Sequence, residues 1–229
     1  MSYTDINQKH TAIIFTSMET AQIKKIIADQ FANPQSALDL QNLLQIVAER
    51  AEVVPSHVDL AHGSSFIYNY IEQVPYLLTV AWTSARNVGI ETEVKSILQM
   101  VESYWIEDDD VIPDSIGIFG IMDDAYCSLL SMQSISDLYR MQTGKHLFPD
   151  DLTAANAIMR KIIGEPYTTE LDEIVSQAVS EAGVEAAIKL LATPEKQRLL
   201  DSEATIWNHG PVGELPVSQL RGLGLIEDS

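Results

Sequence analysis

Residues 90–106, IETEVKSILQMVESYWI, set the fold class of this chain. Their apolar side chains recur at spacings of three and four residues, which is the spacing of one face of an α-helix. Strict alternation of apolar and polar residues, as a half-buried strand would show, is not found in this stretch. We therefore expect an amphipathic helix here, whose inner face is made of Val94, Ile97, Leu98, Val101, Tyr104 and Trp105.

The same spacing recurs along most of the chain, so the sequence predicts an all-α protein. Prolines, glycines and capping residues indicate where the other helices begin and end. We expect a single compact bundle of about seven to nine helices over residues 1–206, and any domain boundary would fall at residues 107–122. The other expected helices cover residues 17–33, 36–52, 65–86 with a kink at Pro75, 123–143, 150–163, 168–191 and 193–206.

The C-terminal residues 207–229 differ in composition from the rest of the chain. They hold four of the 11 glycines and two of the nine prolines, which favours loop over regular structure. We expect a tail with at most one short helix, beginning at Val217.

Length and composition bound the class of protein. With 229 residues, of which 46% are hydrophobic and 21% charged, the chain can bury a core and is too apolar to be disordered. A single cysteine excludes an intramolecular disulfide, and the start MSYTDINQKH lacks the basic and then apolar pattern of a secretion signal. No apolar run approaches the ~18 residues of a membrane span. These features predict a cytoplasmic protein.

Net charge is the strongest global signal, at −19 from 14 basic and 33 acidic residues. Such a surface repels nucleic-acid phosphates and anionic lipids, so the sequence predicts a basic protein partner instead. The 44 residues between Lys95 and Arg140 contain nine acidic side chains and no Lys, Arg or His. We expect this region to face the partner, with contacts from Glu107, Asp108 and Asp109.

The acidic residues of this region also suggest a metal site. Mg²⁺ and Mn²⁺ bind several carboxylate oxygens, and the Pro and Gly residues of the intervening loop permit turns that bring its two ends together. The four candidate ligands are Asp110, Asp114, Asp123 and Asp124. Capping competes with this interpretation, since Asp123 could cap the helix that follows and Asp124 could favour its dipole. The residues predict no other cofactor.

Common catalytic motifs are absent from the sequence, including HExxH, GxSxG, CxxC and GxGxxG. The set formed by His57, Asp59 and His62 has the wrong spacing for one helix face, so helix capping and surface contacts explain it better than a metal. Cys127 lies in an apolar helical pattern without a nearby cation, which predicts a buried, inert thiol.

Residues 110–126, DVIPDSIGIFGIMDDAY, resemble the signature of the YkvA-like bacterial domain of unknown function, approximately D-x-I-P-D-x-I-P-x-x-G-x-x-D-D. Gly117 stands where that family usually has its second proline. The resemblance implies a bacterial origin and a helical hairpin over about residues 100–142, and it implies no agreed activity. The matching positions are Asp110, Ile112, Pro113, Asp114, Ile116, Gly120, Asp123 and Asp124.

Two classes of function follow from these observations. The first is a soluble, non-catalytic interaction or regulatory component, such as an adaptor, an inhibitor or a subunit, that binds a basic protein partner. The second is a metal-dependent hydrolase acting on a phosphorylated or nucleotide substrate through the 110–124 aspartates. The first needs only charge and fold, so the sequence favours a protein that is not an enzyme.

Overall fold

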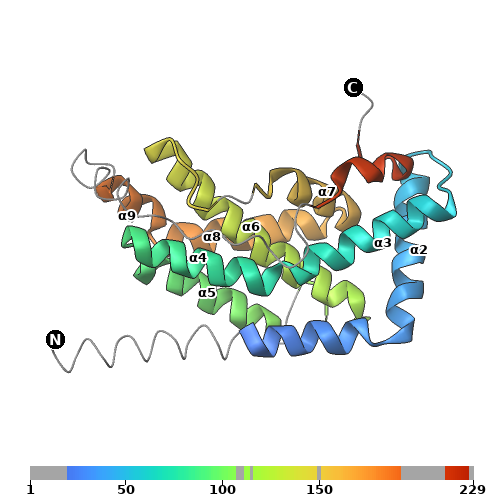
Figure 1. The fold of residues 1–229 in the computed structure, drawn as a ribbon, viewed down its shortest axis with the longest axis horizontal. Helices are drawn as coiled ribbons and strands as arrows, with labels where there is room; N and C mark the ends of the chain where they lie inside the picture. Colours follow the sequence, from blue (N-terminus) through green and yellow to red (C-terminus); the bar gives the residue numbers. More distant parts are fainter. Residues whose placement is uncertain (1–19, 107–110, 114–115, 149–150, 192–214, 227–229) are drawn as a thin grey trace.

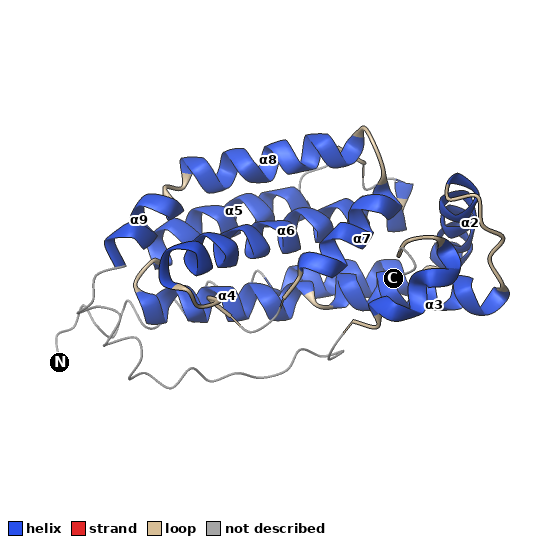
Figure 2. Cartoon of the chain, turned by 90° about the horizontal axis from the view of Figure 1, so that it is seen from above, coloured by secondary structure: helices blue, strands red, loops and turns tan. Residues whose placement is uncertain are grey.

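A computed structural model describes residues 20–106, 111–113, 116–148, 151–191 and 215–226. These residues fold into helices and the loops that join them, and none of them forms a β-strand (Figures 1 and 2). The expected all-α fold is therefore confirmed. Within the described ranges, no helix combines the length and the apolar character needed to cross a bilayer.

The helices from residue 20 to α5 and from α7 to α9 follow one another with short connections. The first described helix covers residues 20–31. After it come α2 (Pro34–Arg50), α3 (His57–Glu72), α4 (Val74–Val88), α5 (Glu91–Ile106), α6 (Ile118–Thr143), α7 (Thr153–Ile163), α8 (Tyr167–Glu181), α9 (Val184–Leu191) and the 3₁₀ helix η2 (Val217–Leu223).

Helix α6 is the central element of the bundle. It contacts α2, α3, α4, α5, α7, α8 and α9, and Figures 1 and 2 show it in the middle of the bundle. From Ile118 to Leu129 every residue except Phe119 is buried. A helix whose whole circumference is buried needs apolar or small residues on all sides, and most of this stretch meets that need.

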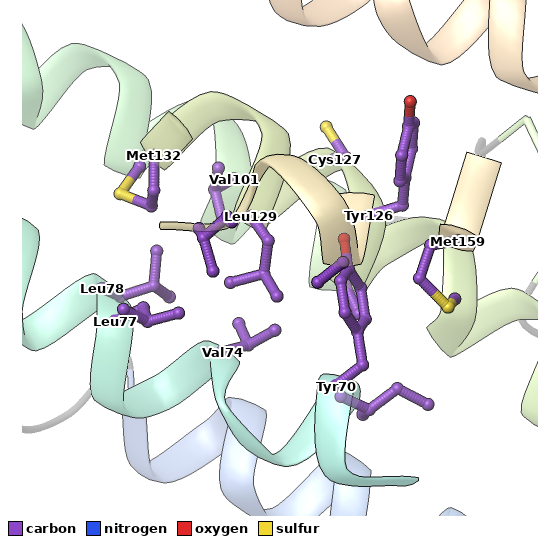
Figure 3. Close-up of a cluster of buried hydrophobic side chains, with 14 of the residues drawn as sticks. Tyr70, Val74, Leu77, Leu78, Val101, Tyr126, Cys127, Leu129, Met132 and Met159 are labelled. Atoms are coloured by element: carbon purple, nitrogen blue, oxygen red, sulfur yellow. The ribbon is translucent and has the colours of Figure 1, made fainter. Parts of the chain in front are cut away.

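The core forms where α6 meets its neighbours (Figure 3). Leu129 of α6 lies against Val74 and Leu77 of α4 and Val101 of α5, and all four side chains are buried. Each such aliphatic side chain contributes about 1.5–3 kcal/mol when it leaves water. Burial of these side chains holds α4, α5 and α6 together.

The helix expected over residues 65–86 is two helices, α3 and α4, so its prediction as one kinked helix is wrong. The break falls at Gln73, and Pro75 lies in the first turn of α4, where a missing N–H costs no hydrogen bond. Helix α3 begins earlier than expected because Ser56 caps it. The Ser56 side chain accepts from the Asp59 N–H, and the Asp59 carboxylate accepts from the Ser56 N–H.

Replacing Ser56 with alanine is expected to lower the free energy of unfolding by about 1 kcal/mol, because the Asp59 N–H loses its acceptor. Hydrogen bonds from the Ser56 hydroxyl and backbone hold the pKa of Asp59 below its ordinary value of 3.8. A lowered native pKa stabilises the fold above the unfolded pKa, and this contribution disappears as pH falls through the native pKa.

The difference between Ser56→Ala and wild type should therefore shrink when urea unfolding is measured at about pH 3 instead of about pH 7. Ser65→Ala, an exposed serine inside the same helix, is the control and should not destabilise the protein. An equal loss at both pH values would contradict this account of the cap.

Two other boundaries differ from expectation. The helix expected over residues 168–191 breaks into α8 and α9 at Gly183, whose φ of 70° lies in the left-handed region that glycine adopts without strain. Helix α2 is capped by Asn33, whose side chain accepts from the Gln35 N–H, and not by Ser36. The Ser36 hydroxyl donates instead to the Gln30 carbonyl oxygen at 2.8 Å.

The described part of the C-terminal tail, residues 215–226, contains η2 and packs on α2 and α3. The short helix begins at Val217, as the sequence predicts. Its Leu220 and Leu223 side chains are fully buried, and Leu225 is nearly so. The helix expected over residues 193–206 lies outside the described residues.

Candidate functional site

A groove of about 610 Å³ opens on the surface between α6, α7 and α8. Its walls combine aliphatic side chains with amide, hydroxyl and charged groups, which is the composition expected of a recognition site. Side chains from all three helices line it, among them Tyr126, Leu130, Gln133, Asp137, Leu138, Met141, Asn156, Arg160, Asp172, Val175 and Val179.

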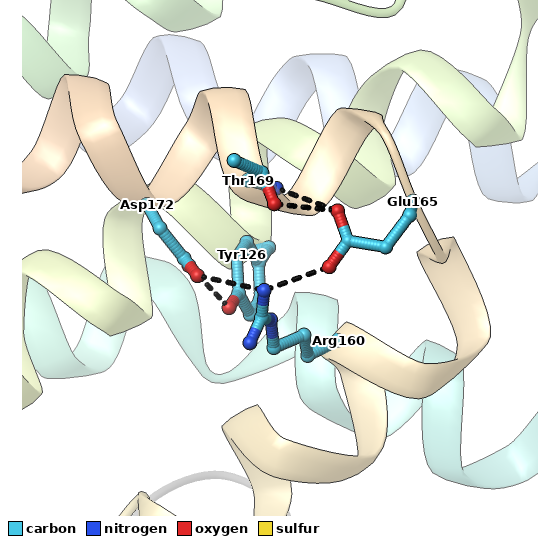
Figure 4. A network of polar contacts seen from close by, with 5 residues as sticks. All are labelled: Tyr126, Arg160, Glu165, Thr169 and Asp172. Carbon is cyan, nitrogen blue, oxygen red and sulfur yellow. Dashed lines mark hydrogen bonds and ion pairs between the residues drawn. The ribbon is translucent and has the colours of Figure 1, made fainter.

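Tyr126, Arg160 and Asp172 of this lining belong to a network in which two carboxylates share one guanidinium (Figure 4). Arg160 Nη2 lies 2.8 Å from Glu165 Oε1 and 3.3 Å from Asp172 Oδ2. The Tyr126 hydroxyl donates to Asp172 Oδ1 at 2.8 Å, and the Thr169 hydroxyl donates to Glu165 Oε2 at 2.6 Å. The network therefore joins α6, α7 and α8 and keeps one unit of negative charge in excess.

The pKa values in this network follow from its contacts. Burial, and then the hydrogen bond to Asp172, raises the pKa of Tyr126 far above its ordinary value. The hydrogen bond from Thr169 holds the pKa of Glu165 below its ordinary value. At neutral pH Tyr126 is thus a neutral donor and Glu165 an anion.

A second polar chain runs from the core to the other side of the groove. The Tyr70 hydroxyl of α3 donates to Asn156 Oδ1 at 2.5 Å, and Asn156 Nδ2 donates to Gln133 Oε1 at 2.6 Å. Gln133 Nε2 then donates to Thr153 Oγ1 at 3.2 Å. Burial raises the pKa of Tyr70 well above its ordinary value, so this hydroxyl also stays a donor. The chain fixes both amides at the floor of the groove.

Aliphatic side chains at the groove edge are open to solvent. Met141 is 76% exposed, and Leu130 and Leu138 on the same helix are half-buried. Asp137 lies one turn from Met141, with its carboxylate 3.4 Å from Arg140. An exposed methionine beside carboxylates is a surface that can pack against an apolar side chain and attract a cation.

The lining residues of the groove include no histidine or cysteine. The network carboxylates are held by Arg160, Tyr126 and Thr169. The Asp172 carboxylate already accepts from the Tyr126 hydroxyl and forms an ion pair with Arg160. The arrangement can orient a ligand through shape, hydrogen bonds and charge.

The acidic region singled out in the sequence is only partly described. Glu107, Asp108, Asp109, Asp110 and Asp114 lie outside the described residues. Their expected contacts with a partner or a cation therefore stay predictions.

Asp123 and Asp124 are fully buried, and the prediction that they begin the helix is wrong. Helix α6 begins at Ile118, more than one helical turn before Asp123 and Asp124. Asp123 Oδ2 accepts from the Ile112 N–H at 3.1 Å and from the Tyr104 hydroxyl at 3.3 Å. Its carboxylate thus ties the segment before α6 to α5 and does not cap α6.

No group of three or more His, Cys, Asp or Glu side chains within the described ranges is arranged to hold a metal. Of the four expected ligands, only Asp123 and Asp124 belong to those ranges. Cys127 is buried, as predicted. Asp59 belongs to the capping box of α3, which confirms capping as the better account of the His57, Asp59 and His62 set.

The sequence interpretation missed the groove. Its polar residues come from segments far apart in the chain, and their only local signal is a polar residue on an apolar helix face. Asn156 gives that signal, because it stands beside Ala155 and one turn before Met159, both buried.

Comparison with known protein families, curated proteins and solved structures gives no match for this chain.

Proposed function

We propose that this chain is a cytoplasmic, non-catalytic interaction or regulatory component whose groove between α6, α7 and α8 binds a basic, amphipathic helix of a protein partner. The observation that carries the proposal is the pairing of an apolar edge with carboxylates in one groove. Such a partner places apolar side chains in the groove and cations at its rim.

Charge supports a cationic occupant. Glu165 and Asp172 share the single guanidinium of Arg160, so one of their two negative charges is not neutralised. This remaining negative charge would attract a cation of the partner. The net charge of −19 adds a long-range field that attracts a basic partner and repels nucleic acid. Two of the nine acidic side chains between Lys95 and Arg140, Asp123 and Asp124, are buried and add nothing to this surface.

Shape supports a helical occupant. Leu130, Leu138 and Met141 follow one another along one face of α6, while the buried Val175 and Val179 of α8 line the groove from the other side. A row of aliphatic side chains along one helix suits a partner helix that offers apolar residues at spacings of three and four. Met141, as a flexible side chain, can adapt to different apolar partners.

A cationic amphipathic peptide of about 18 Lys and Leu residues is a suitable probe, since its length matches a groove-binding helix. Asp172→Asn is expected to weaken its binding about three- to tenfold, because the amide keeps the Tyr126 hydrogen bond and loses the charge. Fluorescence anisotropy at about 50 mM and about 300 mM salt measures the affinity, which should fall as salt screens the field.

Glu91→Gln is the matched control, since it removes the same charge from an exposed position on α5, away from the groove. It should change the affinity less than about twofold. Equal weakening by the two variants would show attraction to the whole surface and contradict a site in the groove. No binding at low salt would contradict the proposal altogether.

The metal-dependent hydrolase is the alternative that the sequence raises, and no observation in the described residues favours it. Calorimetric titration of the full chain with Mg²⁺, Mn²⁺ and Ca²⁺ tests it directly. A cation that binds only the native state must raise the thermal midpoint, so heat together with such a shift would support the alternative.

A further inference from the structure

The groove between α6, α7 and α8 carries charged side chains at two places along α6. The lining residues of α6 recur at spacings of three and four, so they form one row along the face of the helix that borders the groove. The groups around Tyr126 and Asp137 decide which charges a bound helix would meet. The full row consists of Tyr126, Leu130, Gln133, Ser134, Asp137, Leu138 and Met141.

The first charged place is next to Tyr126. The Tyr126 hydroxyl donates to Asp172 Oδ1 at 2.8 Å, and Arg160 forms ion pairs with both Asp172 and Glu165 (Figure 4). The Asp172 side chain is 35% exposed and the Glu165 side chain 59%, so a cation can approach both from solvent. Two carboxylates and one guanidinium leave one negative charge in excess here.

The second charged place is at Asp137. Its carboxylate is 37% exposed and lies 3.4 Å from Arg140 Nη2. Asp151 is close by, because Thr153, which lines the groove, donates its N–H to Asp151 Oδ1 at 3.0 Å. Hydrogen bonds from Thr153 hold the pKa of Asp151 below its ordinary value, and the nearby His146 and Arg140 act in the same direction. With histidine neutral at pH 7, two carboxylates and one guanidinium again leave one negative charge in excess.

Aliphatic side chains separate the two charged places. Leu130 lies between Tyr126 and Asp137 on α6 and is half-buried. Val175, one turn after Asp172, lines the groove from α8. A helix bound along α6 would therefore meet an anionic, then an aliphatic and then an anionic surface.

The spacing of the two places matches the geometry of a helix. Tyr126 and Asp137 are 11 residues apart on α6, which separates the two places by about 16 Å. In a bound helix 11 residues also make close to three full turns, because each turn takes about 3.6 residues. Cations 11 positions apart in the partner thus lie on one face and can reach both places together.

We propose that the partner helix carries basic residues at positions i and i+11 and apolar residues at positions i+4 and i+7. This inference rests on the proposed function of the groove and adds the order of side chains that the partner offers. All four positions fall within about 60° of arc on one helix face. The two cations meet the excess negative charge at the two places, and the apolar side chains pack between them against Leu130 and Val175.

Two alanine-based peptides of about 18 residues test this order with the wild-type protein. Both contain two lysines and place leucine at i+4 and i+7. The first has its lysines at i and i+11, and the second has them at i and i+9, which turns the second lysine to the opposite face. Fluorescence anisotropy at about 50 mM salt should show about three- to fivefold tighter binding of the first peptide, because only it offers a cation to each place.

The outcomes separate this inference from the proposed function. Equal affinities of the two peptides would overturn the order of side chains, as would binding of the Lys and Leu peptide described above without binding of either alanine-based peptide. In both cases the proposed function of the groove would stand. If none of the three peptides binds, the proposed function and the order of side chains both fall.

Two variants of the protein locate the contacts. Asp137→Asn and Asp172→Asn each remove the charge at one place and keep a side chain of the same shape. Each should weaken binding of the i, i+11 peptide about three- to fivefold, whereas Glu91→Gln should change it less than about twofold. Circular dichroism checks that all three variants fold. Weakening by Asp172→Asn alone would show a single charged contact and overturn the two-ended order.

Discussion

Replacing Trp105 with alanine lowers the free energy of unfolding by about 3–5 kcal/mol, the usual cost of emptying a buried tryptophan site. Trp105 is 1% exposed on α5, and its Nε1 donates to the Ser128 hydroxyl of α6 at 2.9 Å. The Ser128 hydroxyl in turn donates to the Asp124 carbonyl oxygen at 2.7 Å. The indole thus fills the space between two helices and also joins them by a hydrogen bond. Urea unfolding followed by circular dichroism measures the loss.

Trp105→Phe separates packing from hydrogen bonding in this contact. It keeps most of the apolar volume and removes the N–H donor, so it should cost less than the alanine variant, about 1–2 kcal/mol. A loss below about 1 kcal/mol for Trp105→Ala would mean that the site collapses without penalty. That result would contradict the close packing of α5 on α6.

Asn156→Ala is expected to cost about 2–4 kcal/mol, because it leaves two polar groups without their partner in a closely packed region. Asn156 is 3% exposed, accepts from the Tyr70 hydroxyl and donates to Gln133 Oε1. The Tyr70 side chain has no exposed surface in the native protein, and Asn156 Oδ1 is the acceptor of its hydroxyl there. Urea unfolding again provides the measurement.

A double-mutant cycle with Tyr70→Phe tests the origin of that loss. If the Tyr70 hydrogen bond is the main contribution, Tyr70→Phe and Asn156→Ala together should cost about 1–2 kcal/mol less than the sum of the single variants. Additive losses would show that the two side chains do not act as a pair. Ala157→Ser, at an exposed position on the same helix, should change stability little and is the control.

Most of the helices were predictable because they place apolar residues on one face, whereas the start of α6, which is buried on all sides, was misplaced. The helix expected at residues 90–106 is α5, which begins at Glu91 and buries Val94, Ile97, Leu98, Val101 and Trp105. The breaks were harder to place. Gln73 and Gly183 divide stretches whose apolar spacing continues on both sides, so the spacing of apolar residues alone gives no reason to end a helix there.

The candidate site was not predictable from local pattern. Acidic residues are conspicuous in the sequence, yet Asp123 and Asp124 are buried because α6 is surrounded by other helices, and their neighbours in sequence do not reveal that. The groove depends on the meeting of Gln133, Asn156 and Asp172 from three helices. Their proximity is a property of the tertiary packing, which the spacing of apolar residues does not encode.

The enclosed position of α6 gives the protein a built-in chemical reporter. Its one thiol, Cys127, has no exposed surface in the native bundle, so alkylating reagents can reach it only when neighbouring helices separate. The rate of alkylation therefore reports how often the bundle interior opens, and no added label is needed. Ligands that tighten the bundle slow this rate, which makes Cys127 a direct means of screening for the partner.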